Sequence, residues 1–188
     1  MLSHSFKRSD YDSCVYLKTV KGSAIYLLLY VDDMLIAAKD KSEIAKLKAQ
    51  SNKKFEMKDL GTAKKILGVE IIRDRKSGML YLSQRGYIEN VLRRFNMHDA
   101  KPVSTPLAAH FRLSSALCPM SDDDIEYMSK IPYSSAVGSL MYIMVCSHPD
   151  LSHALSVVSR YMANRGKQYW KAVQWIFKYL RGTSSACL

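Results

Sequence analysis

The chain of 188 residues has few of the residues that build metal or disulfide scaffolds. Its four cysteines are far apart and form no CxxC pair, which argues against a zinc site or a disulfide framework. Its five histidines form no HExxH motif, and no apolar run reaches the length of about 18 residues that a membrane span needs. The polar N-terminus has no signal-peptide core. We therefore expect reduced thiols and no membrane partner.

Acidic residues are also scarce, because 17 of them face 28 lysines and arginines, for a net charge of +11. The basic residues are spread along the chain, which favours a phosphate-binding face on folded structure over a basic tail. The length suffices for one core or for two small subdomains.

Two adjacent carboxylates interrupt the apolar stretch AIYLLLYVDDMLIAA at residues 24–38. Residues 25–30 and 34–38 are predicted to be strands buried on both faces, with Val31, Asp32 and Asp33 in the tight turn between them. Neighbouring carboxylates repel each other, and a divalent cation such as Mg²⁺ would neutralise them. The alternative is an ordinary solvated turn, since Asp tolerates turn geometry.

The remaining pattern predicts an α+β fold. A short strand at 14–17 and a turn at 21–23 precede residue 24, and a helix follows from the N-cap candidates Asp40 and Ser42 to about residue 54, with Ile44, Leu47 and Phe55 on its apolar face. Strands at 66–73 and 79–83 flank a polar loop at 74–78, which predicts a second hairpin.

The second half of the chain is predicted to be mainly helical. A helix begins near Gln84, a long connection covers 96–132 with a short helix capped by Ser121, and Gly182 is expected to end the last helix in the C′ position. Three further helices are expected at 134–146, 149–164 and 167–181. The buried stripe of the first is expected to hold Val137, Leu140, Met141 and Met144.

Several segments resemble one family. The Tyr30-Val31-Asp32-Asp33 hairpin resembles the YxDD hairpin of reverse transcriptases, and its surroundings are similar to the copia-type LTR retrotransposon version. The resemblance continues through KFEMKDLG (54–61), ILGVEI (66–71), LSQRGYI (82–88), VSTPL (103–107), YSSAVGSLMY (133–142) and KYLRGT (178–183). It implies a palm-type antiparallel sheet with packed helices at 1–83, including a primer-grip-like hairpin, and a helical thumb and connection at 84–188.

The resemblance also implies a chemistry and partners. Asp32 and Asp33 would be catalytic metal ligands for Mg²⁺, with Mn²⁺ as a substitute, in two-metal phosphoryl transfer. Tyr30 and Val31 would position the primer end. Arg73, Arg75 and Lys76 would bind nucleic acid. The implied partners are an RNA or DNA template with primer, dNTP in the intact enzyme, and the fingers and RNase H segments of the Pol polyprotein. The implied location is the cytoplasm, including virus-like particles, or the nucleus, without secretion.

Some features depart from the family pattern. Ser51 stands where Leu is usual, and SHPD (147–150) and NRGKQYW (164–170) differ from TRPD-like and NPxxxHW sequences. A third palm carboxylate and the fingers have no counterpart, since Asp10 and Asp12 do not match that motif, and Met1 looks like an internal position of a polyprotein. We therefore expect a fragment that is inactive alone. The alternatives are a non-catalytic nucleic-acid-binding remnant and a domesticated interaction protein whose acidic turn is only structural.

Overall fold

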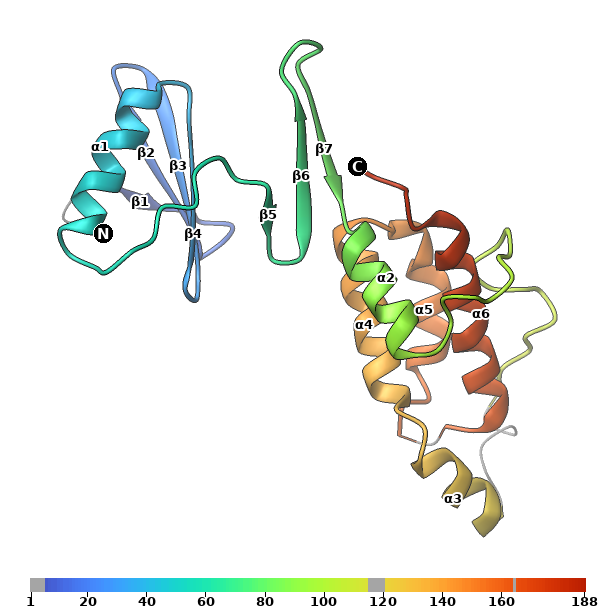
Figure 1. Cartoon of the computed structure of the whole chain (residues 1–188). Helices are drawn as coiled ribbons and strands as arrows, with labels where there is room; N and C mark the ends of the chain where they lie inside the picture. Colours follow the sequence, from blue (N-terminus) through green and yellow to red (C-terminus); the bar gives the residue numbers. More distant parts are fainter. Residues whose placement is uncertain (1–5, 115–120, 164) are drawn as a thin grey trace. The chain divides into compact units, whose positions relative to one another are not determined.

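The computed structural model describes residues 6–114, 121–163 and 165–188 (Figure 1). The chain divides into two compact units, the first ending at Ile66 and the second beginning at Leu67. Both α-helices and antiparallel sheets are present, which confirms the predicted α+β mixture. No helix within the described ranges is long and apolar enough to cross a membrane.

The first unit is a four-stranded antiparallel sheet, in the order β1-β2-β3-β4, with one helix. A tight turn joins β2 to β3 where one was predicted, but it holds only Lys21 and Gly22, both at positive φ, and Ser23 already belongs to β3. Asp40 caps α1 by accepting a hydrogen bond from the Ser42 backbone N–H (2.8 Å). The elements are β1 (Lys7–Arg8), β2 (Val15–Val20), β3 (Ser23–Tyr30), β4 (Asp33–Ala38), α1 (Lys41–Asn52) and β5 (Lys65–Ile66).

The core of this unit is small and lies on one face of the sheet. Its four buried apolar side chains are Phe6, Ile25, Leu27 and Leu47. The prediction that β3 is buried on both faces is wrong, because side chains alternate along a strand and those of the second face, such as Tyr26 at 51% exposure, stay accessible.

The predicted apolar face of α1 is also partly wrong. The helix ends at Asn52, so Phe55 lies beyond it and is 58% exposed. Ser51 is buried at the position where the pattern calls for an apolar residue, and it leaves this small core without one side chain. Removing one large buried side chain lowers the free energy of unfolding by about 2–5 kcal/mol.

The second unit joins a hairpin to a helical bundle. The hairpin strands pair antiparallel from Glu70 with Ser83 to Asp74 with Met79. The elements are β6 (Val69–Asp74), β7 (Met79–Ser83), α2 (Arg85–Arg94), α3 (Asp122–Ser129), α4 (Tyr133–Cys146), the 3-10 helix η3 (Pro149–Leu151), α5 (Ser152–Ser159) and α6 (Lys167–Thr183).

The bundle has a large, continuous core. Twenty-one buried apolar residues from α2 to α6 form one cluster, and the rings of Phe95 and Phe177 stack at 5.0 Å within it. As predicted, Ser121 caps α3 through its side chain, which accepts from the Asp124 backbone N–H. The three aspartates in the first turn of α3 favour its dipole.

Three helical predictions need correction. Val137 and Leu140 are buried as predicted, but Met141 is at the surface, at 36% exposure, because α4 turns Ile143 to the core in its place. The helix predicted for 149–164 is η3 followed by the short α5, since the chain turns after Ser159 to enter α6 at Lys167; Asn164 lies outside the described residues.

The last correction concerns Gly182, which is not a C′ residue. Helix α6 continues to Thr183, and Gly182 has no positive φ. A Cβ at this position would come within 3.2 Å of the Pro102 Cβ, so the glycine allows close packing of the segment that contains Pro102.

Candidate active site and nucleic-acid interface

The Val31-Asp32 turn joins β3 to β4. Tyr30 pairs with Asp33, so Asp33 is the first residue of β4. The prediction that Asp33 belongs to the turn is therefore wrong. Val31 occupies the first turn position with φ 51° and is 89% exposed. A two-residue hairpin loop needs positive φ there, which normally selects glycine.

Val31 makes this turn strained. The β-branched side chain in the left-handed region costs about 1–2 kcal/mol. The turn gains no compensating burial, because Val31 is almost fully exposed. Strained residues are enriched at functional sites, and the sheet register holds this one in place.

Asp32 and Asp33 are both exposed. Among the described residues, no lysine or arginine lies within ion-pair distance of either carboxylate. Carboxylate oxygens are hard donors that suit Mg²⁺, and water has access to complete its shell. The two residues therefore fit part of a magnesium ligand set.

Asp10 and Asp12 lie in the loop between β1 and β2, at the same end of the sheet as the Val31-Asp32 turn. The Leu29 backbone N–H donates to the Cys14 carbonyl (2.9 Å), which fixes that end. However, Asp12 Oδ1 accepts from the Cys14 N–H (2.8 Å), and Asp10 pairs with Lys7 at 3.4 Å. In the described part of the chain, no three acidic, histidine or cysteine side chains form a metal-binding group.

The predicted nucleic-acid residues lie together on the β6–β7 hairpin. Arg73 is in β6, Arg75 and Lys76 are in the loop, and all three are exposed. Asp74 Oδ1 accepts from the backbone N–H groups of Lys76 (2.8 Å) and Ser77 (3.3 Å). The loop therefore presents its cations on an ordered turn.

Hydrogen bonds from Ser77 and then from the Lys76 backbone lower the pKa of Asp74 below its ordinary value of 3.8. Since the folded pKa is depressed, the contribution of Asp74 to loop stability is present above pH 3.8. It is lost as the pH falls through the lowered pKa. The loop remains ordered by this carboxylate at neutral pH.

Side chains of the bundle hold the base of this hairpin. The Tyr142 hydroxyl of α4 donates to the Leu67 carbonyl, and its ring meets that of Tyr87 edge to face at 5.2 Å. Leu82 and Leu188 exchange two backbone hydrogen bonds, of 2.9 and 3.0 Å, so the end of the described chain adds to β7. The hairpin base is thereby positioned on α2 and α4.

The anchoring role of these residues was not predicted from the sequence. Tyr142 and Leu67 belong to two of the resembling segments, YSSAVGSLMY and ILGVEI, so the shared segments themselves were the available signal. Nothing local in either segment indicates that they contact each other, because 75 residues separate them.

The departing segment SHPD is well accommodated. Ser147 Oγ donates to Gln84 Oε1 (2.6 Å), and His148 Nε2 donates to the Thr183 carbonyl (3.1 Å). Both residues are buried, and together they join the ends of α4, α2 and α6.

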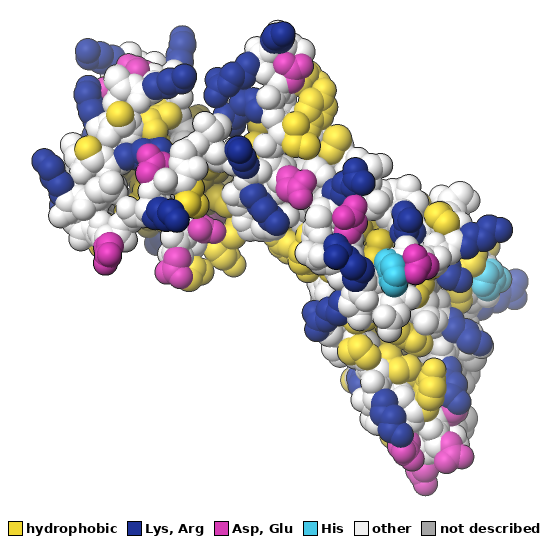
Figure 2. Space-filling view, viewed as in Figure 1, with side chains coloured by type: hydrophobic (Ala, Val, Ile, Leu, Met, Phe, Trp, Pro, Cys, Tyr) yellow, Lys and Arg dark blue, Asp and Glu magenta, His cyan; other side chains and the backbone are white. Residues whose placement is uncertain are grey.

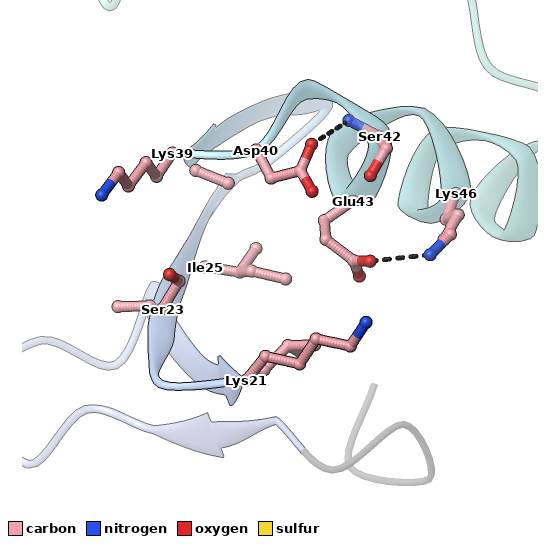
Figure 3. Close-up of a pocket in the computed structure, with 11 residues that line it drawn as sticks. Lys21, Ser23, Ile25, Lys39, Asp40, Ser42, Glu43 and Lys46 are labelled. Carbon is pink, nitrogen blue, oxygen red and sulfur yellow. Dashed lines mark hydrogen bonds and ion pairs between the residues drawn. The ribbon is translucent and has the colours of Figure 1, made fainter.

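Figure 3 shows a pocket of about 150 Å³ at the other end of the β3–β4 hairpin, beside the start of α1. Its polar groups mostly satisfy one another: Asp40 accepts from Ser42, and Lys46 pairs with Glu43 at 2.7 Å. The lining carries the cations Lys21, Lys39 and Lys46 together with the acids Asp40 and Glu43, so the pocket has no pronounced preference for an anion.

Comparison with known proteins places these features in a family. Residues 1–109 match the model of the family described as "Reverse transcriptase (RNA-dependent DNA polymerase)". The chain is 57% identical, over its whole length, to the retrovirus-related Pol polyprotein from transposon TNT 1-94 of Nicotiana tabacum, of which it covers 14%.

Two further relatives match almost the whole chain. The Pol polyprotein from transposon RE2 of Arabidopsis thaliana is 33% identical over 97% of the chain, which covers 12% of that polyprotein. The putative transposon Ty5-1 protein YCL074W of Saccharomyces cerevisiae is 29% identical over 97% of the chain and is covered to 57%. No solved structure matches the chain significantly. The chain thus spans a small part of the polyproteins that it resembles, and it belongs to the reverse transcriptase family of copia-type retrotransposon Pol polyproteins.

Proposed function

We propose that this chain is the part of a copia-type reverse transcriptase that presents two catalytic carboxylates and grips the primer–template. The observation that carries the proposal is the exposed Asp32–Asp33 pair on a strained turn, inside the segment that matches the family model. Residues 1–83 would be the palm with a primer-grip-like hairpin, and residues 84–188 the thumb and connection. This functional division falls within the second compact unit, so the grip and the thumb would act as one body.

Asp32 and Asp33 would hold Mg²⁺, or Mn²⁺ in its place. The ions supply activation of the primer hydroxyl and stabilisation of the leaving pyrophosphate when bound. Tyr30, half exposed beside the turn, and Val31 at its apex would form the floor under the primer end. The sheet register would keep that floor in one position despite the strain at Val31.

Arg73, Arg75 and Lys76 would bind the phosphates of the primer–template. Their exposure and the ordered turn at Asp74 support this role, and so does the anchoring of the hairpin base to α4. Phosphate contacts of this kind position a duplex without reading its sequence.

Two carboxylates supply only part of the ligands that two metal ions need. We therefore propose that other Pol segments contribute the remaining carboxylate and the residues that grip dNTP, and that the chain alone does not extend a primer. A second candidate, a nucleic-acid-binding protein without catalysis, is favoured by the net charge of +11 together with the exposed basic hairpin.

The metal site is tested by titrating Mg²⁺ or Mn²⁺ while following the backbone amides of residues 31–34 by NMR. We expect weak, saturable shifts that the double variant Asp32→Asn and Asp33→Asn abolishes. The matched control is Asp10→Asn with Asp12→Asn, which removes two exposed acids at the same end of the sheet. Equal responses in the two double variants would refute the assignment.

The grip is tested by the salt dependence of primer–template affinity. Neutralising Arg73, Arg75 and Lys76 to Gln should reduce the slope of log affinity against log salt by about 0.9 for each phosphate that the variant no longer neutralises. Neutralising the exposed Lys39, Lys41 and Lys53 removes the same charge and should change the slope less. If the two triple variants had equal slopes, only non-specific charge attraction would remain as an explanation, and the proposed role of the hairpin would be wrong.

Catalysis is tested by incubating the chain with primer–template, four dNTPs and Mg²⁺. We expect no extension above background. Extension that disappears in Asp32→Asn would show that this chain holds the complete site, and Asp10 and Asp12 would be the next residues to substitute.

A further inference from the structure

The face of α6 opposite the bundle core is basic and carries one tryptophan. Lys171, Trp175 and Lys178 follow one another at spacings of four and three residues, on the side opposite the buried Val173 and Leu180. The helix contains no acidic residue. Figure 2 shows basic side chains over the visible face of the helical unit, whereas acidic ones gather at its α3 end.

A long segment between α2 and α3 lies along this helix (Figure 1). We call residues 97–114 the strap. Three side chains of α6, six residues apart, donate hydrogen bonds to its carbonyls: Arg181 Nε to His98 O (2.6 Å), Trp175 Nε1 to Thr105 O (2.9 Å) and Tyr169 OH to Ser114 O (2.8 Å). The strap is thus fixed on α6 at both ends and in the middle.

The strap brings two aromatic rings to Trp175. The His110 ring lies 4.3 Å from that of Phe111, with their planes tilted by 36°. Trp175 meets His110 at 5.5 Å and Phe111 at 5.8 Å, both edge to face. Lys178 Nζ lies 6.0 Å from the centroid of the Trp175 ring. His110 is exposed, and so is Arg112, two residues further along the chain.

An exposed ring with cations nearby suits unpaired nucleotides. A base can stack on an aromatic ring only when it is not covered by its neighbours in a duplex, and nearby lysines bind the phosphates that flank it. The two tryptophans of the chain differ in this respect, since Trp170 packs against the bundle core while Trp175 contacts the strap.

We propose that His110, Trp175, Lys171 and Lys178 form a binding site for single-stranded nucleic acid, with a base stacked on His110 and phosphates bound by the two lysines. The site deepens the proposed function, on which it rests, because it would hold an unpaired part of the template. It lies on the strap and α6, and it shares no residue with the basic hairpin or the Asp32–Asp33 turn.

The experiment follows Trp175 fluorescence in the Trp170→Phe variant, in which Trp175 is the sole tryptophan. Titration with short oligo(dT) and with oligo(U) should quench the emission, while a blunt duplex of equal length should quench it much less. Replacing His110 with Ala should weaken single-strand affinity roughly 5- to 150-fold, the range measured for one stacked base. His110→Phe, which keeps an aromatic ring, should restore it.

The matched control is His98→Ala, which removes another exposed histidine of the strap but keeps the backbone carbonyl that Arg181 binds. Circular dichroism verifies that each variant is folded. If Trp170→Phe does not fold, the native chain and Trp175→Phe are compared instead, and the oligonucleotide-dependent quenching should disappear in the latter.

The lysines are tested separately. Lys171→Gln with Lys178→Gln should reduce the single-strand salt slope by about 0.7 for each phosphate that the variant no longer neutralises, and Lys53→Gln with Lys130→Gln should not. Substituting Arg73, Arg75 and Lys76 should leave the quenching intact, so failure of the grip is distinguishable from failure of this site. Equal affinities of His110→Ala and His98→Ala, or equal quenching by duplex, would overturn the proposal and leave the rings only a role in fastening the strap.

Discussion

The two compact units differ greatly in how much apolar surface they bury. The described part of the first unit holds four buried apolar residues in its core, and that of the second holds twenty-one in one cluster. Each buried large side chain contributes about 1.5–3 kcal/mol before entropy is counted, so the first unit is much less stable. The predicted chemistry lies on this weakly packed unit, and the predicted grip lies on the strongly packed one.

The largest expected effect comes from the bundle core. Phe177→Ala removes a ring that stacks on Phe95 and should lower the free energy of unfolding by about 3–5 kcal/mol. Tryptophan emission during denaturation measures it, because both tryptophans are in α6. An effect of less than about 1 kcal/mol would mean that this core is loosely packed.

Leu27→Ala should cost the first unit about 2–4 kcal/mol, since Leu27 is fully buried in its small core. We expect the β3 and β4 amide signals to be lost in NMR spectra while the tryptophan transition stays unchanged. A matching shift of the tryptophan transition would show that the units unfold together and would contradict the comparison.

Val31→Gly should stabilise the first unit by about 1 kcal/mol, because glycine adopts φ 51° without strain. If this gain in stability is accompanied by weaker Mg²⁺-induced amide shifts at Asp32 and Asp33, the contrast between the weakly packed first unit and the second becomes sharper. Amide hydrogen exchange in β3 and β4 measures the gain. Slower exchange in the native chain than in the variant would argue against strain.

The smallest effect distinguishes two helical glycines of the second unit. Gly138→Ala in α4, where a Cβ would have no neighbour within 4 Å, should gain about 0.5–1 kcal/mol from helix propensity. Gly182→Ala should show no such gain in stability, because its Cβ would lie 3.2 Å from the Pro102 Cβ. Thermal unfolding of both variants tests the pair. Equal gains would mean that the strap moves away at no cost.

Local patterns predicted much of the fold. The caps at Asp40 and Ser121 and the β6–β7 hairpin depend on residues within a few positions of one another, and they are confirmed. Predictions that required knowledge of what covers a face failed. The two-sided burial of β3, the place of Met141 and the role of Gly182 are examples.

The sequence by itself determined the family, the adjacent carboxylates and the excess of basic charge, because each is carried by residue order or composition alone. Only the tertiary structure decided which distant segments meet: Tyr142 with Leu67, Gln84 with Ser147, and the strap with α6. These contacts join residues 55 to 83 positions apart. Their free energy depends on burial and on hydrogen-bond geometry that exist only after the chain has folded.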